Sequence, residues 1–361
     1  MSGRIGHGLG HGLGLGAVLI AAVACSAPPS APSVQLRVAV SAAAGIAGAR
    51  ALVAACAQAG VALEAPVARA DLDGGAVAML LDEAAARGVP VALRPVADDA
   101  VGGPAISSAA LPRLARDVER LVAIVVAAPG SRATLVLELA PPRALAAEVL
   151  ARLDVTSGPG RGGRLYELLA TRLDERGHLA DAAMLGAIVA GARAGGVSVE
   201  ARLWPILVDD GRDGDSALGD ALDVPVVARA SVDAALPTLA DGVDVVRLVA
   251  TRALWGGAVV EPAPGALAAA VAALARAVAP TGAARVGLAL GDDSPGALAT
   301  DVAAARGAGI EDLVVDDLPS ADAAWLTALD APAAAPPPSS TGLLDDLRAA
   351  VRDADRLLGW H

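Results

Sequence analysis

Apolar segments typical of β-strands alternate with helix-like segments along most of this 361-residue chain. Such alternation favours a parallel sheet whose strands are joined by right-handed helical crossovers. Eight strand-helix units predict an α/β fold of the TIM-like (β/α)8 barrel class. The candidate strands are residues 34–40, 61–67, 89–96, 133–140, 197–208, 243–249, 285–290 and 312–317. A ninth stretch, 224–230, leaves open a different assignment of strands or an open doubly wound sheet.

The fourth candidate strand carries one carboxylate in an otherwise apolar run. Residues 134–142 read TLVLELAPP, with Glu138 near the end and two prolines that terminate the strand. Apolar residues on both faces indicate a strand covered on both sides, as in parallel sheets. Glu138 is therefore expected at the carboxyl end of a barrel strand, which is where active sites lie in this fold.

The first 33 residues read as an export and anchoring segment. Arg4 precedes an apolar stretch, 13–24, that is too short to span a bilayer, so residues 1–24 are predicted to be a signal peptide. The sequence Ala-Val-Ala-Cys at 22–25 resembles the lipobox of bacterial lipoproteins, which implies lipidation of Cys25. An ordinary cleaved signal is the alternative. Residues 25–33 then form a Pro/Ser-rich tether.

This segment implies a location and one partner. The chain is expected at the bacterial cell envelope, on the outer membrane or the periplasmic face, and held to the membrane through a lipid on Cys25. The barrel domain is predicted over residues 34–330, followed by a Pro/Ala-rich linker at 331–342 and an amphipathic helix at 343–361. Cys56, on a candidate helix, is interpreted as a small buried apolar residue.

Charge and histidine content exclude several functions. The net charge of −12 argues against nucleic acid as a partner, since that needs a basic surface. Of four histidines only His178 lies within the body of the chain, which excludes sites built on several histidines. A Gly-rich run at 156–163 lacks the P-loop lysine, and an Asp-rich run at 209–220 departs from the calcium-loop pattern. We therefore expect no cofactor and no metal, with a metal-dependent hydrolase that uses only carboxylates as a weaker alternative.

The remaining chemistry belongs to carboxylates and arginines at predicted strand ends. Two acids facing one cleft are what glycoside hydrolysis requires, one as proton donor and one as nucleophile or base. Glu138 is the first candidate, and its partner is sought among four aspartates. They are Asp98, Asp99, Asp209 and Asp210. Acids at these places also serve as helix caps, and Arg94 or Arg247 could pair with Glu138 inside the barrel.

Three short motifs resemble the strand ends of a group of bacterial TIM-barrel proteins that are similar to glycoside hydrolases. They are VALRP at 91–95 followed by two aspartates, LELAPP at 137–142, and WPILVDD at 204–210. In that group the fourth strand reads Leu-Asp-Leu-Glu-Pro-Pro, so Glu138 stands at the Asp and Ala140 replaces the Glu. The resemblance covers residues 85–250 and supports the barrel fold more than an activity; if that Glu is catalytic in the group, Ala140 implies that this chain has lost activity.

The sequence hypothesis is thus an envelope-anchored, glycoside-hydrolase-like barrel acting on a carbohydrate by carboxylate acid/base chemistry. Arg94, Trp204 and Arg247 are the candidate substrate-binding residues, with burial in the core as the alternative for Trp204. The alternative function is a non-catalytic barrel lipoprotein that binds an envelope ligand or partner.

Overall fold

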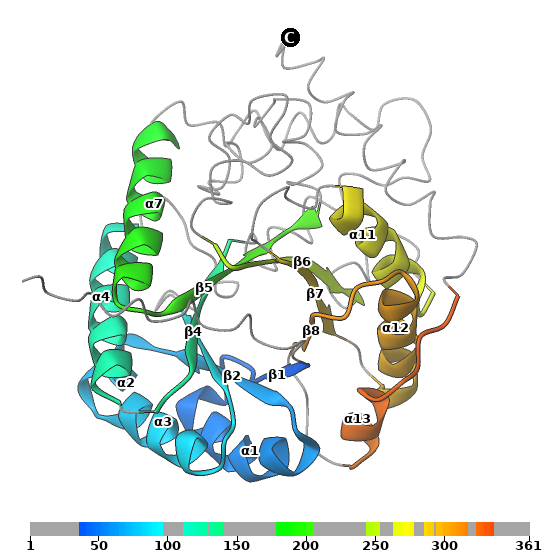
Figure 1. Cartoon of the computed structure of the whole chain (residues 1–361), viewed down its shortest axis with the longest axis horizontal. Helices are drawn as coiled ribbons and strands as arrows, with labels where there is room; N and C mark the ends of the chain where they lie inside the picture. Colours follow the sequence, from blue (N-terminus) through cyan, green and yellow to red (C-terminus); the bar gives the residue numbers. More distant parts are fainter. Residues whose placement is uncertain are drawn as a thin grey trace, which may run out of the picture. The chain divides into compact units, whose positions relative to one another are not determined.

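Eight parallel strands close into a barrel in sequence order, from β1 to β8, with β8 paired to β1 (Figure 1). The computed structural model describes residues 36–96, 111–128, 130–139, 178–205, 243–252, 263–277, 285–291, 294–316 and 323–335. All lie in the second of two units of the chain, Val34–His361. The strands are β1 Arg37–Ala39, β2 Ala62–Val67, β3 Val91–Pro95, β4 Ala133–Glu138, β5 Ser198–Leu203, β6 Val245–Thr251, β7 Arg285–Gly291 and β8 Leu313–Val315.

Helices surround this barrel on the outside (Figure 1). They are α1 Gly45–Ala59, α2 Arg69–Asp73, α3 Ala76–Ala86, α4 Leu111–Ala127, α7 His178–Ala194, α11 Ala266–Ala277, α12 Pro295–Gly307 and α13 Ala323–Ala328. α1 ends as its sequence indicates, at Gly60, whose left-handed φ of 65° suits a residue without Cβ. Small residues let the helices approach closely; a Cβ on Gly195, just after α7, would lie 2.4 Å from Val122 of α4.

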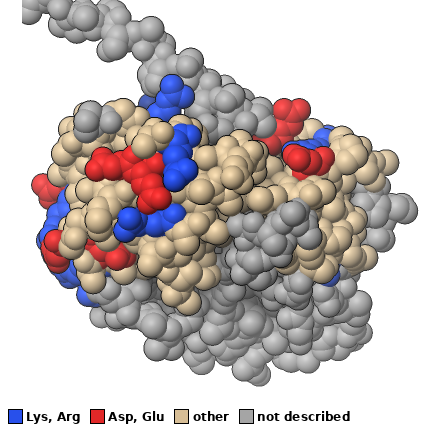
Figure 2. All heavy atoms as spheres, turned by 90° about the horizontal axis from the view of Figure 1, so that it is seen from below, with Lys and Arg blue, Asp and Glu red and all other residues tan. Residues whose placement is uncertain are grey.

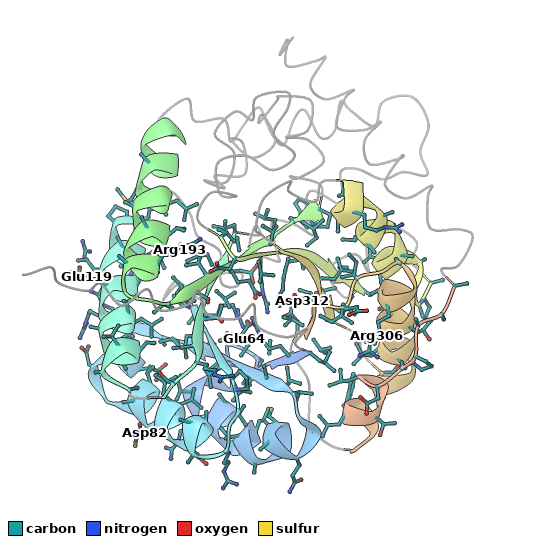
Figure 3. All side chains as sticks on the ribbon, viewed as in Figure 1. Glu64, Asp82, Glu119, Arg193, Arg306 and Asp312 are labelled. Carbon is teal, nitrogen blue, oxygen red and sulfur yellow. The ribbon has the colours of Figure 1, made fainter. Side chains whose placement is uncertain are left out.

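The two faces of the barrel strands differ sharply in polarity. Along β2, Leu63, Ala65 and Val67 alternate with Glu64, and all four are buried. Figure 3 places Glu64 and Asp312 inside the ring of strands, whereas Asp82, Glu119, Arg193 and Arg306 lie on the surrounding helices. The apolar side chains therefore pack under the helices, and charged side chains fill the barrel interior. Bulky aliphatic residues usually fill that space.

Charges on the outer helices are paired and partly exposed. Ion pairs join Arg50 of α1 to Glu83 of α3, and Arg69 of α2 to Asp117 of α4. Acidic and basic side chains are accordingly intermixed on the face shown in Figure 2. Exposed pairs of this kind contribute little to stability. The charges that shape this protein are those inside the barrel.

The predicted fold class is confirmed, and each of the eight candidate strands is present. The fifth is shorter than expected, because β5 ends at Leu203. Cys56 is buried on α1, as predicted, and burial raises the pKa of its thiol to about 11. The start of the predicted linker lies along α12, since the Ala334 N–H donates to the Ala303 carbonyl. The segments 1–35, 224–230 and 336–361 fall outside the described residues. Among the described helices, none has the length and apolar character needed to span a membrane.

Candidate functional site

Glu138 is the last residue of β4 and so lies at the carboxyl end of the barrel. Its neighbour in the sheet register is Arg202 on β5. The carboxylate Oε2 of Glu138 is 3.7 Å from Nη1 of Arg202. Neither Arg94 nor Arg247 forms an ion pair with Glu138 among the described contacts, so the arginine partner differs from both sequence candidates.

Arg202 gathers three acids from distant parts of the chain. Its Nη1 donates to Oδ1 of Asp316, just after β8, at 2.6 Å, and its Nη2 donates to Glu64 of β2. The guanidinium is only 1% exposed. Burial alone would lower the pKa of Arg202, but the carboxylates of Asp316, Glu64 and Glu138 raise it above its usual range. Arg202 is thus a fixed positive charge at the centre of the site.

Arg94 of β3 lies on the other side of Glu64. Its Nε donates to Oε1 of Glu64 at 2.9 Å, and its Nη2 donates to the backbone carbonyl of Val40 at 3.3 Å. Glu64 therefore accepts hydrogen bonds from three arginines, Arg94, Arg202 and, at 3.5 Å, Arg37. All three guanidiniums are held in place by this one buried carboxylate.

A second layer lies deeper in the barrel around Glu200 of β5. Oε1 of Glu200 accepts from Nε of Arg247 at 2.7 Å, and Oε2 accepts from Nη1 of Arg37 at 2.9 Å. Burial would raise the pKa of Glu200, yet Arg247, Arg37 and Arg202 outweigh it and lower that pKa to about 2. Glu200 is therefore ionised at neutral pH and serves as an anchor for the arginines.

Gly287 of β7 makes room for this deeper layer. A Cβ at that position would lie 2.6 Å from Nη1 of Arg247 and 2.5 Å from the backbone oxygen of Asp312. Arg247 also donates to Oδ1 of Asp312 at 3.1 Å. The space that a side chain at Gly287 of β7 would occupy is thus filled by the guanidinium of Arg247 from β6.

Glu138 is the acid of the site whose proton affinity is most affected. Burial raises the pKa of Glu138 to about 7, opposed by Arg202 and Arg94 and assisted by Asp316 and Glu64. The residue is 9% exposed and makes no hydrogen bond with any described residue. A carboxyl whose pKa lies near the working pH can both give and take a proton.

Glu138 and Asp316 form a pair of acids on one arginine. Both contact Nη1 of Arg202, at 3.7 Å and 2.6 Å, so their nearest oxygens are no further apart than the sum of those distances. That upper bound lies below the carboxyl spacing of about 6.5 to 9.5 Å in inverting glycosidases, and the spacing of about 5 to 5.5 Å in retaining ones falls within it. The arrangement supplies two carboxyls with different environments at the barrel mouth.

The structure brings together three of the candidate catalytic and substrate-binding residues. Glu138, Arg94 and Arg247 belong to the charged network, while Trp204, directly after β5, is fully buried in the core, as its alternative interpretation had it. Asp98, Asp99, Asp209, Asp210 and Cys25 lie outside the described residues. No cluster of three or more potential metal ligands occurs in the described ranges.

Sequence reasoning did not single out Arg37 or Glu200. Both stand inside short apolar runs, LRVAV and VSVEARL, at positions that alternate with branched residues. A charged residue in such a run is the signal that could have marked them, because buried charges require partners.

Comparisons with known proteins are distant. No family model matches the chain, and no curated protein does. Similar solved structures include a D-allulose 3-epimerase from Methylomonas sp., 13% identical over 90% of this chain and 97% of that one, with a TM-score of 0.40. A truncated 3-deoxy-D-arabino-heptulosonate 7-phosphate synthase from Thermotoga maritima is 10% identical over 90% and 87%, with a TM-score of 0.36. A glycoside hydrolase family 3 β-N-acetylglucosaminidase from Paenibacillus sp. is 13% identical over 89% and 61%, with a TM-score of 0.39. The assignment of the fold rests on the closed parallel sheet itself.

Proposed function

We propose that this protein is an exported barrel enzyme that acts on a carbohydrate by carboxylate acid/base chemistry. Glu138 is the proton donor, and Asp316 is its partner at the mouth. The observation that carries the proposal is the pair of carboxyls on Nη1 of Arg202, at the end of the barrel where such enzymes react. Asp98, Asp99, Asp209 and Asp210 remain candidates for the second acid.

The two carboxyls are placed unequally around Arg202. Asp316 accepts a direct hydrogen bond of 2.6 Å, whereas the Glu138 contact of 3.7 Å is too long to be one. Glu138 is therefore the member of the pair that holds the proton, and burial, the chief cause, keeps its pKa at about 7. Two acids whose environments separate their roles are the pattern of enzymes that donate a proton at neutral pH.

The rival proposal is a barrel that binds an envelope ligand without catalysis. It is favoured by the same arginine, because Arg202 holds both carboxyls in ion pairs and could serve only to stabilise the barrel. Ala140, at the position where similar barrels carry Glu, supports this alternative as well. In both proposals the chain is exported and held to the membrane by a lipid on Cys25.

Hydrolysis of a panel of disaccharides, whose sugar leaving groups must be protonated to depart, by the wild type and by Glu138→Gln tests the enzyme proposal. Loss of the proton donor should lower kcat by about 10²-fold or more. Glu83→Gln, which removes a carboxyl from the outer helix α3, is the matched control and should retain full activity. A wild type that turns over no glycoside, or a Glu138→Gln protein as active as the control, contradicts the proposal.

A further inference from the structure

Five charged groups form the cluster at the barrel mouth, which we call the mouth cluster. It comprises Glu138 and the four charged groups that influence it, Glu64, Arg94, Arg202 and Asp316. They come from β2, β3, β4, β5 and the residue just after β8. When Glu138 is protonated, the two guanidiniums balance the two remaining carboxylates. The mouth cluster is then neutral.

Both arginines of the mouth cluster are already paired. Arg94 donates to Glu64 at 2.9 Å, and Arg202 donates to Glu64 and Asp316. An anionic ligand group would have to draw one of these guanidiniums away from a buried carboxylate. Breaking a buried ion pair leaves an uncompensated charge, which is costly. The mouth cluster is therefore unsuited to an anionic ligand.

Glu138, unlike the two arginines, has no hydrogen-bond partner among the described residues. It is nine-tenths buried and lies at the end of β4. Among the described residues nothing donates to the Glu138 carboxyl, and its side chain is 11% exposed, so a ligand or a water can reach it. A neutral carboxyl can donate its proton to a hydroxyl or ether oxygen of a sugar. A cation placed there would instead favour the ionised carboxylate and displace the proton.

We propose that the mouth cluster selects uncharged sugars, with Glu138 as the residue that decides between neutral and charged ligands. The inference rests on the proposed function and deepens it. A sugar with a protonated amine binds by replacing the Glu138 proton, so it acts as an inhibitor and not as a substrate. A sugar with a carboxylate finds no free guanidinium and binds weakest.

Binding of three sugars that differ only at C6 tests the proposal without any need for turnover. The probes are glucose, 6-amino-6-deoxyglucose and glucuronate, with the matching derivatives of galactose and mannose, measured by NMR titration at pH 6 and pH 8. The aminosugar should bind roughly tenfold tighter at pH 8, because a carboxyl with a pKa of about 7 ionises over that interval. The neutral sugar should show no such gain, and the uronate should bind weakest at both pH values.

Glu138→Gln provides the second variant, because it keeps the size of the side chain and removes its charge. It should bind neutral sugar and aminosugar equally at both pH values, with Glu83→Gln behaving as wild type. Uronate binding tighter than neutral sugar, or aminosugar binding that does not change with pH, overturns the charge selection while leaving a carbohydrate function intact. If none of the glucose, galactose and mannose derivatives binds, both the carbohydrate function and this inference are overturned.

Discussion

The guanidinium of Arg202 on β5 donates to the carboxylate of Glu64 on β2, across the interior of the barrel. These strands are not neighbours in the sheet, so the contact is made by side chains that span the interior. Arg202 is 1% exposed and Glu64 is fully buried. The barrel is thus held together inside by ion pairs as well as outside by apolar packing, and this arrangement makes several predictions.

Arg202→Met should destabilise the barrel strongly. The substitution leaves Glu64 and Asp316 without their shared guanidinium, and removing one partner of a buried ion pair costs about 3 to 5 kcal/mol. Urea unfolding followed by circular dichroism measures the difference. Arg50→Met, which breaks a partly exposed pair with Glu83, should cost less than about 1 kcal/mol. Equal losses in the two variants would show that the interior pairs do not stabilise the fold.

Gly287→Ala should also destabilise, through steric conflict. The new Cβ would meet Nη1 of Arg247 at 2.6 Å and the Asp312 backbone oxygen at 2.5 Å, and overpacking of this kind costs about 1 to 3 kcal/mol. Gly186→Ala on α7 is the control, since nothing lies within 4 Å of its Cβ, and it should stabilise by about 0.5 to 1 kcal/mol. Thermal unfolding of both variants checks the opposite signs. A Gly287→Ala protein as stable as wild type would refute the close packing.

Stability should fall as the pH rises from about 4.5 to 7. The folded protein raises the pKa of Glu138 from 4.5 to about 7, chiefly by burial, so in this window the folded state holds a proton that the unfolded state has released. The slope from this group is at most about 1.4 kcal/mol per pH unit. Free energies of unfolding measured at half-unit intervals should show this slope in wild type and lose it in Glu138→Gln. An unchanged slope in that variant would assign it to another group.

Glu200 should have the opposite effect at lower pH. Its pKa is lowered from 4.5 to about 2, so its contribution to stability is present above pH 4.5 and is lost as the pH falls toward 2. Glu200→Gln should therefore be less stable than wild type at pH 5, and the two should converge near pH 2. Acid titrations of both proteins by circular dichroism measure the convergence. A constant difference between them down to pH 2 would contradict the lowered pKa.

Cys25→Ser should abolish attachment of a lipid. If residues 22–25 are a lipobox, metabolic labelling with a radioactive fatty acid should mark the wild-type protein and the Cys56→Ala variant, but not Cys25→Ser. Cys56 is the appropriate control because it is buried on α1 and its thiol has a pKa of about 11, which makes it unreactive. Labelling that survives in Cys25→Ser would exclude the predicted anchor.

The order of elements and the fold class could be predicted because they follow from local patterns. Runs such as TLVLE and VVRLVAT are apolar on the face that meets the helices, and this periodicity is present in the sequence itself. Glu138 could be placed at a strand end for the same reason, since two prolines follow shortly after it. Eight such units predict a parallel sheet, and the structure shows that this sheet closes into a barrel.

The partners inside the barrel could not be predicted, because they depend on closure and stagger. Arg202 contacts Glu64, Glu138 and Asp316. These three acids lie far apart in the sequence and come together only when β8 pairs with β1. Which of several arginines reaches Glu138 is decided by strand register and side-chain length, and neither leaves a local signal. The sequence by itself determined the strand-helix units and the place of the principal acid at a strand end. The tertiary structure decided which charges surround that acid, because burial and ion pairing are properties of the closed barrel alone.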